Sequence, residues 1–136
     1  MSVRVQSGPG IQRVRGVLYI FEYAVITIAI FAFLVWRYLY ATGGVDVLEV
    51  LFWVIFPDLA AFIPIGIASK NGTWPAWGAY VYNFFHTILV WVAVFAVVWI
   101  ILGTPHLELL GWLGHITTDR TVGYGLRETK SARLTG

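Results

Sequence analysis

Three apolar stretches constrain this chain more than any other feature, because each is long enough to cross a lipid bilayer alone. They run from Val17 to Ala41, from Val45 to Ala68 and from Ala76 to Leu102, and about 20 apolar residues span the hydrocarbon core. The composition agrees, since 59% of the residues are hydrophobic and only 12% are charged, against about 25% charged in soluble domains. The sequence therefore predicts an integral membrane protein.

A fourth stretch, from Pro105 to about Leu126, is shorter and more polar. We interpret it as a span that the other three shield, since its polar residues could not face lipid. Gly123 and Gly125 predict a break where this helix leaves the membrane. Short loops rich in turn residues separate the stretches, which places consecutive helices antiparallel. We therefore expect an all-α, up-down-up-down four-helix bundle that forms a single transmembrane domain over residues 1–136.

Basic residues lie mostly on one side of the predicted spans. They are Arg4, Arg13 and Arg15 before the first span, Lys70 in the second loop, and Arg127, Lys130 and Arg133 after the fourth. The loops at 42–44 and 103–104 contain no Lys or Arg. The positive-inside rule then places both termini in the cytoplasm, and we expect a multi-pass protein of the inner (cytoplasmic) membrane. The ends, residues 1–12 and 128–136, are expected to be mobile or to lie on anionic lipid.

Charge and cysteine content exclude several classes of function. The formal net charge of +2 is spread over the two ends, so the chain has no basic patch for nucleic acid. There are no cysteines, which excludes disulfides and thiolate metal ligands. The expected partners are membrane lipids and either further copies of the chain or a larger membrane complex.

The ionisable residues inside the spans fall at similar predicted depths. At 1.5 Å per residue, Asp58, His86 and His115 lie near the midplane on three different helices. Asn83 lies one turn from His86, and Asp119 one turn from His115, on the same helix faces. Ionisable groups cost a few kcal/mol each at such depths and usually mark a site. We therefore expect one polar cluster at or just inside the midplane.

Four further residues have a structural and a functional interpretation. Glu22 and Arg120 fall near the level of the cluster, and we interpret them first as a buried ion pair, with a catalytic role for Glu22 as the alternative. Asn83 is interpreted first as an interhelical hydrogen-bonding residue, with the orientation of a ligand or water as the alternative. His106 follows Pro105 and is interpreted as an interfacial residue.

Two imidazoles and two carboxylates make the predicted cluster a candidate metal site. Asp58, His86, His115 and Asp119 form a donor set suited to one zinc, manganese or iron ion. His115 and Asp119 are four residues apart, a spacing that lets two side chains converge on one ion. The alternative is an ion-free polar core in which the carboxylates pair with Arg120 and the histidines. No other cofactor is expected.

Three motifs carry a resemblance to a known family. They are Phe56 to Leu59 (Phe-Pro-Asp-Leu), Val81 to Thr87, and Gly114 to Arg120 followed by Gly123 to Leu126. With a glutamate early in the first span, Glu22, this combination resembles the small bacterial and archaeal membrane family catalogued as domain of unknown function 4260. The resemblance covers about Val14 to Arg127 and implies a membrane fold, but no established activity.

A more distant similarity suggests a chemistry. Pro57-Asp58, His86-Thr87 and the Gly111 to Asp119 segment follow the order of motifs in YdjM-like proteins, regarded as metal-dependent membrane hydrolases. Ala60 stands where that family has a second acidic residue, and its His-Arg pair is absent near Val81 and Tyr82. The similarity therefore implies one ion at most.

These observations lead to one functional hypothesis and two alternatives. The hypothesis is a metal-dependent hydrolase acting on a lipid-like substrate, with the ion lowering the pKa of a bound water. In it, Glu22 or Asn83 would position that water, and Arg120 would bind an anionic group such as a lipid phosphate. The alternatives are a non-enzymatic accessory or assembly subunit of a membrane complex, and a small ion or proton relay.

Overall fold

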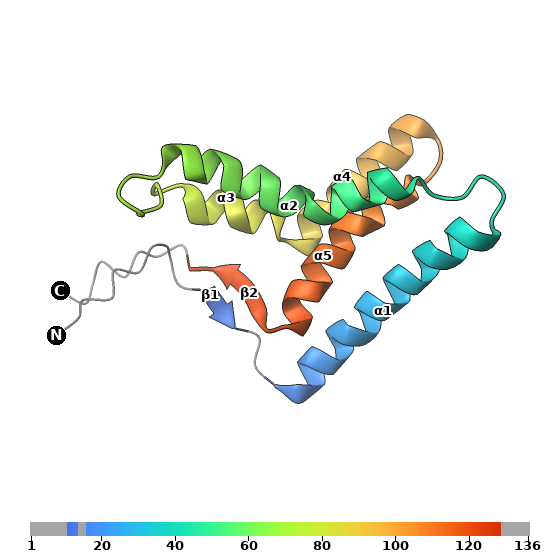
Figure 1. The fold of residues 1–136 in the computed structure, drawn as a ribbon, viewed down its shortest axis with the longest axis horizontal. Helices are drawn as coiled ribbons and strands as arrows, with labels where there is room; N and C mark the ends of the chain where they lie inside the picture. The colour runs from blue at the N-terminus through green and yellow to red at the C-terminus, as the bar shows by residue number, and fades with distance from the viewer. Residues whose placement is uncertain (1–10, 14–15, 129–136) are drawn as a thin grey trace.

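The computed structural model describes residues 11–13 and 16–128, which are mostly helical. In chain order the elements are β1 (Ile11–Arg13), α1 (Val17–Tyr40), α2 (Val47–Ala68), α3 (Gly78–Phe85), α4 (Ile88–Leu102), the 3-10 helix η1 (Leu107–Leu109), α5 (Leu110–Thr121) and β2 (Tyr124–Arg127). Helices α2 and α3 lie side by side, and α5 runs beside α1 (Figure 1). The loops predicted between the apolar stretches are thus present, and the first two helices follow each other as predicted.

Two helices, α1 and α2, are long and apolar enough to cross a membrane, and the bent pair of α3 and α4 makes a third span if it is counted as one. Their outer faces carry large uncovered apolar side chains such as Val17, Leu48 and Ile100. Such surfaces are costly in water and normal against lipid tails. The prediction of membrane-type apolar helices is confirmed, while the four-helix bundle and the position of the termini stay predictions.

The stretch from Ala76 to Leu102 forms two helices, so the prediction of one continuous helix there was wrong. Helices α3 and α4 meet at 57°, because Thr87 has an extended backbone with φ −100° and ψ 125°. A break leaves carbonyl groups without helical partners, which is tolerated at membrane depth only if other groups bind them. Here the indole of Trp112 donates to the Phe85 carbonyl at 2.8 Å, and Arg120 donates to the His86 carbonyl at 2.9 Å.

Helix α5 is short and lies at the centre of the fold. Its 12 residues extend about 18 Å at 1.5 Å per residue, well short of the hydrocarbon thickness of about 30 Å. The predicted fourth span therefore does not form one crossing helix but contains η1, α5 and β2. Side chains such as Trp112, Ile116 and Thr117 are buried, so the other helices do shield this segment. The helix ends before Gly123, which has φ +94°, as the glycines predict.

Two glycines let α5 approach its neighbours closely. A Cβ atom on Gly111 would lie 2.5 Å from the carbonyl oxygen of Val50 in α2. One on Gly114 would lie 2.7 Å from the ring of Phe31 in α1. Small residues serve this purpose in membrane helix packing, because they allow backbones to approach. The polar face of α5 is thereby held against α2.

A two-stranded antiparallel sheet, which the all-α prediction missed, joins the two ends of the described chain. Ile11 pairs with Arg127, and Arg13 pairs with Tyr124. Ile11 and Gln12, at the end of the segment predicted to be mobile or to lie on anionic lipid, thus belong to β1, and the fourth predicted span ends in a strand rather than a helix. The rest of the basic ends, residues 1–10 and 129–136, lies outside the described residues.

Candidate metal centre

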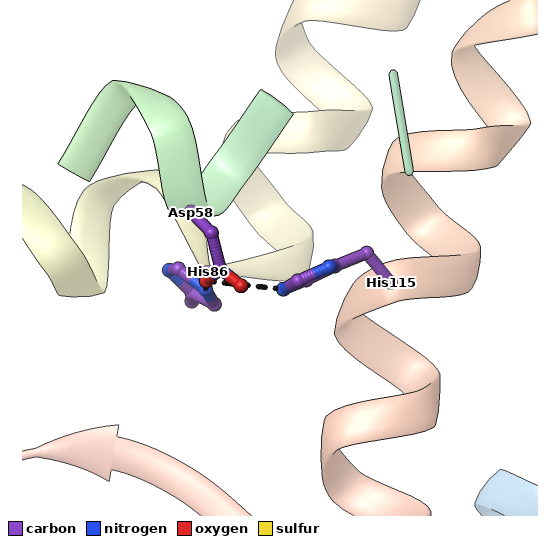
Figure 2. Close-up of side chains that lie close together, drawn as sticks. All are labelled: Asp58, His86 and His115. Carbon is purple, nitrogen blue, oxygen red and sulfur yellow. Dashed lines mark hydrogen bonds and ion pairs between the residues drawn. The ribbon is translucent and has the colours of Figure 1, made fainter. Parts of the chain in front are cut away.

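Three predicted ligands converge from three helices. Asp58 lies in the middle of α2, His86 follows the last residue of α3, and His115 lies on α5. The Nε2 atoms of His86 and His115 lie 3.1 and 3.4 Å from Oδ1 of Asp58 (Figure 2). One potential donor atom from each residue lies within 4.8 Å of the other two. This spacing is small enough for a single ion to bind all three.

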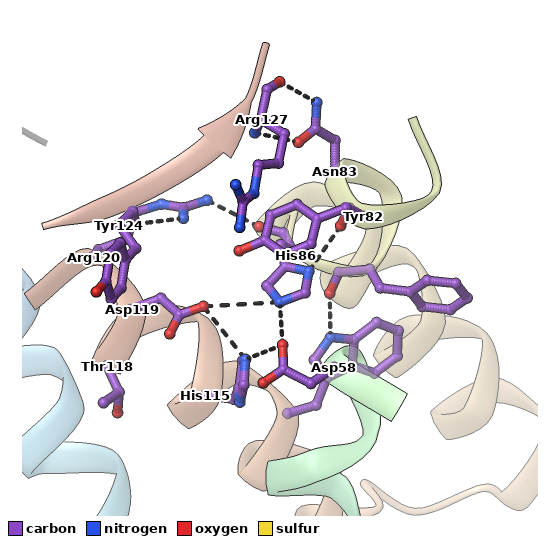
Figure 3. A network of polar contacts seen from close by, with 12 residues as sticks. Asp58, Tyr82, Asn83, His86, His115, Thr118, Asp119, Arg120, Tyr124 and Arg127 are labelled. Atoms are coloured by element: carbon purple, nitrogen blue, oxygen red, sulfur yellow. Dashed lines mark hydrogen bonds and ion pairs between the residues drawn. The ribbon is translucent and has the colours of Figure 1, made fainter. Parts of the chain in front are cut away.

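Asp119 adds a second carboxylate to the same place. Its Oδ2 atom lies 3.4 Å from Nε2 of His115 and 3.8 Å from Nε2 of His86 (Figure 3). We call Asp58, His86, His115 and Asp119 the central cluster. The structure therefore brings together all four residues that the sequence suggested as metal ligands.

The ring of His86 is held so that one nitrogen faces the carboxylates. Its Nδ1 atom donates to the carbonyl oxygen of Tyr82 at 2.8 Å, since a carbonyl can only accept. The ring stacks on that of Tyr82 with centroids 3.9 Å apart, and the side chain is 0% exposed. A backbone carbonyl that fixes one imidazole nitrogen is the usual partner of a metal-ligating histidine. The other ring nitrogen, Nε2, is thereby directed toward Asp58 and makes a hydrogen bond of 3.1 Å with its Oδ1 atom.

His115 presents a buried nitrogen that lacks a hydrogen bond. Its Nε2 atom has no hydrogen-bond partner among the described residues, although carboxylate oxygens of Asp58 and Asp119 lie 3.4 Å away. An unsatisfied buried polar atom costs about 1–3 kcal/mol. A cation between the imidazoles and the carboxylates would satisfy Nε2, so the donor set and its geometry fit a divalent ion.

A polar cavity of about 270 Å³ adjoins the central cluster. Its lining consists of Asp58, Phe62, Tyr82, Asp119, Tyr124 and Arg127. The guanidinium of Arg127 lies over the rings of Trp74 and Tyr82, at 5.0 and 5.1 Å from their centroids. The cavity thus combines two carboxylates with one cation and two phenol rings. A small anionic group could enter it and reach the central cluster.

Asn83 holds the strand that forms one side of this cavity. Its Nδ2 atom donates to the carbonyl of Arg127 at 2.8 Å, and its Oδ1 atom accepts from the amide of Arg127 at 2.7 Å (Figure 3). Both functional groups of the side chain are therefore engaged with β2. The hydrogen-bonding interpretation of Asn83 holds, although its partner is a strand rather than another helix, and the orientation of a ligand or water by this side chain stays a prediction.

Arg120 and Glu22 do not form the predicted ion pair. Arg120 is 8% exposed and donates to the carbonyl oxygens of Tyr124 at 3.0 Å and His86 at 2.9 Å (Figure 3). Glu22 lies on an exposed face of α1. The pairing prediction was wrong because the carbonyls of His86, at the helix break, and of Tyr124, in β2, take up the guanidinium. The catalytic and relay roles suggested for Glu22 stay predictions.

Sequence reasoning missed four residues of the cavity: Phe62, Tyr82, Tyr124 and Arg127. Tyr82 lies one turn before His86 on the same helix face, and Phe62 one turn after Asp58, positions that could have been noticed. Tyr124 lies near the end of the predicted fourth span and Arg127 just after it, and only the strand brings them to the cavity. No pattern in the sequence indicates that pairing.

Comparison with known proteins yields one match. The family described as Domain of unknown function (DUF4260) matches residues 22–136. No curated protein and no solved structure matches significantly, so the similarity to YdjM-like proteins stays a prediction. Because the match covers most of the sequence and includes all four residues of the central cluster, the chain belongs to the DUF4260 family.

Proposed function

We propose that the protein binds one divalent metal ion in the central cluster and uses it to hydrolyse a lipid-like substrate. The observation that carries this proposal is the convergence of two oriented imidazoles on two carboxylates. In particular, Nε2 of His115 is buried without a hydrogen bond while two carboxylate oxygens lie 3.4 Å away. Zinc, manganese and iron suit such a mixed nitrogen and oxygen donor set.

In this proposal Asp58, His86 and His115 would hold the ion. Three protein ligands with an open position are the usual arrangement of catalytic zinc. When bound, a divalent ion would act as a Lewis acid and lower the pKa of a water ligand toward about 7. Asp119 lies within 4 Å of both imidazoles and lines the cavity, so its carboxylate would accept the proton of the attacking water.

The cavity supports the choice of an anionic, amphipathic substrate. Arg127 offers a planar cation suited to a phosphate or carboxylate group. Phe62 lines the same cavity and is 39% uncovered by protein, so an acyl chain beside it could lie in the lipid. The basic residues near β2 would place this opening at the cytoplasmic leaflet of the inner membrane.

The metal part of the proposal is tested by elemental analysis of untagged protein purified in detergent. We expect about one equivalent of zinc, manganese or iron in the central cluster, and its loss in the His86→Ala/His115→Ala variant. Glu22→Gln is the matched control, because this carboxylate lies on an exposed face of α1. A variant that keeps its full metal content while folded would refute the metal centre.

The hydrolase part is tested on the metal-loaded protein with phosphate monoesters and carboxylic esters of lipids in mixed micelles. Asp119→Asn should keep the metal and lose turnover, because the amide cannot accept the proton. Metal binding without turnover on either substrate class would leave a non-enzymatic metal-binding membrane protein. A folded protein that never takes up metal would favour the accessory-subunit alternative.

A further inference from the structure

A second group of histidine and carboxylate side chains lies at the other end of α2. Glu49 is in the first turn of α2, His106 precedes η1, and Glu108 lies in η1. Nε2 of His106 lies 2.5 Å from Oε1 of Glu49, and Nδ1 lies 3.6 Å from Oε2 of Glu108. We call these three residues the α2-start cluster. They were not linked in the sequence analysis, where His106 was interpreted as an interfacial residue.

Both glutamates of this cluster are held in place by other groups. Oε1 of Glu49 accepts from the indole of Trp53 at 3.1 Å, and Oε1 of Glu108 accepts from the backbone amide of Asp46 at 3.1 Å. One donor atom from each of the three residues lies within 4.8 Å of the other two. The ligand atoms are therefore preorganised across two segments that are far apart in the sequence.

The charge balance of the α2-start cluster favours a cation. A third carboxylate, that of Asp46, lies beside the two glutamates. Its Oδ1 atom accepts from the amides of Leu48 and Glu49 at the helix start. His106 is the ion-pair partner of both glutamates, and it carries at most one positive charge. Two carboxylates thus face one imidazole, so the cluster has a net negative charge whatever the state of His106.

We propose that Glu49, His106 and Glu108 form a second site for a divalent cation of the zinc or manganese class. One imidazole nitrogen with two carboxylates suits these ions. The cation would lie between the imidazole of His106 and the two carboxylates, in place of their direct contact. It would also fasten the start of α2 to the segment between α4 and η1. This site shares no residue with the central cluster, so neither proposal depends on the other.

The test compares zinc content in four untagged proteins loaded with zinc chloride and freed of excess metal. Wild type and the Glu22→Gln control should hold about two equivalents, one for each cluster. Glu49→Gln/Glu108→Gln and His86→Ala/His115→Ala should each hold about half of that. If Glu49→Gln/Glu108→Gln keeps the wild-type content, or if His86→Ala/His115→Ala holds none, the second site is refuted.

A second measurement does not depend on the folding of the glutamine variant. In His86→Ala/His115→Ala the proposal places the zinc left in the α2-start cluster, and His106 is the only histidine left in that variant. X-ray absorption should then show one imidazole among oxygen ligands around the zinc. A shell of oxygen atoms without imidazole would overturn the proposal, because the ion would lie elsewhere.

Discussion

The two clusters use the same side-chain chemistry on very different supports. The central cluster draws its residues from α2, α5 and the break between α3 and α4, and its two histidines are 0% and 13% exposed, although the side chain of Asp58 is 48% exposed. The α2-start cluster lies at the start of α2 and in the segment between α4 and α5. The side chains of His106 and Glu49 are 29% and 36% exposed. The central cluster therefore depends on the packing of helices, whereas the α2-start cluster depends on local hydrogen bonds.

This difference separates the consequences of mutation at the two places: a change in the packing of α5 beyond Gly111 should disturb only the central cluster. Gly114 brings α5 against α1, and Arg120 ties α5 to the break after α3. The α2-start cluster should tolerate such changes, because its carboxylates are oriented by Trp53 and Asp46.

The largest effect is expected on metal affinity when a ligand of one cluster is neutralised. Asp58→Asn removes the carboxylate that both imidazoles face, and should weaken zinc binding in the central cluster by at least about 100-fold, since even changes behind the ligands cost 10–100-fold. Titration against a competing chelator measures the effect. Glu49→Gln is the control, and it should weaken only the other zinc. An unchanged central affinity in Asp58→Asn would show that this carboxylate is no ligand.

Removal of the Arg120 side chain should cause the largest loss of stability. Arg120→Met leaves the buried carbonyls of His86 and Tyr124 without this donor, at a cost of about 3 kcal/mol in the free energy of unfolding. Chemical unfolding in detergent micelles measures that loss. Arg37→Met, near the end of α1, should cost less than about 1 kcal/mol. Equal losses in the two variants would contradict the capping of the helix break.

A methyl group at Gly114 should disturb the central cluster through packing alone. In Gly114→Ala the new Cβ atom meets the ring of Phe31 in α1 at 2.7 Å, so α5 must shift, at a cost of about 2 kcal/mol. Gly66→Ala on α2 is the matched control, because nothing lies within 4 Å of its new atom, and it should be neutral or slightly stabilising. Zinc affinity should fall in the central cluster and stay constant in the α2-start cluster. A fall in both would remove the distinction between the clusters.

The smallest effect is expected from the residue that holds β2. Asn83→Ala loses two hydrogen bonds to the backbone of Arg127 and should cost about 1 kcal/mol. Hydrogen exchange at the Arg127 amide should become faster. In Asn83→Asp the acceptor for that amide is kept and only the donor is lost, so exchange should be intermediate. Unchanged exchange in Asn83→Ala would show that the strand is held by its pairing with β1 instead.

Much of the central cluster could be predicted because depth in a membrane helix is read directly from residue number. Asp58, His86 and His115 were placed at one level by counting from the ends of their spans, and Asp119 by its one-turn spacing from His115. Glu22 satisfied the same count and yet lies outside the cluster. Depth fixes one coordinate of a side chain, while the rotation of its helix depends on packing.

The fold was predictable where hydrophobic length decides it, and unpredictable where tertiary contacts do. The apolar runs that form α1 and α2 indicate two spans without further information. The break after Phe85 has neither proline nor glycine to signal it, and its carbonyls are bound by Trp112 and Arg120 from α5. The pairing of β1 with β2 joins segments more than a hundred residues apart, so no local pattern predicts it.

The most direct test of the central claim is the zinc X-ray absorption spectrum of the Glu49→Gln/Glu108→Gln variant, in which the metal left occupies the central cluster. The account predicts two imidazole ligands, from His86 and His115, together with carboxylate oxygen from Asp58. A spectrum with one imidazole or none, or a folded variant that holds no zinc, would contradict a metal centre between α2, α3 and α5.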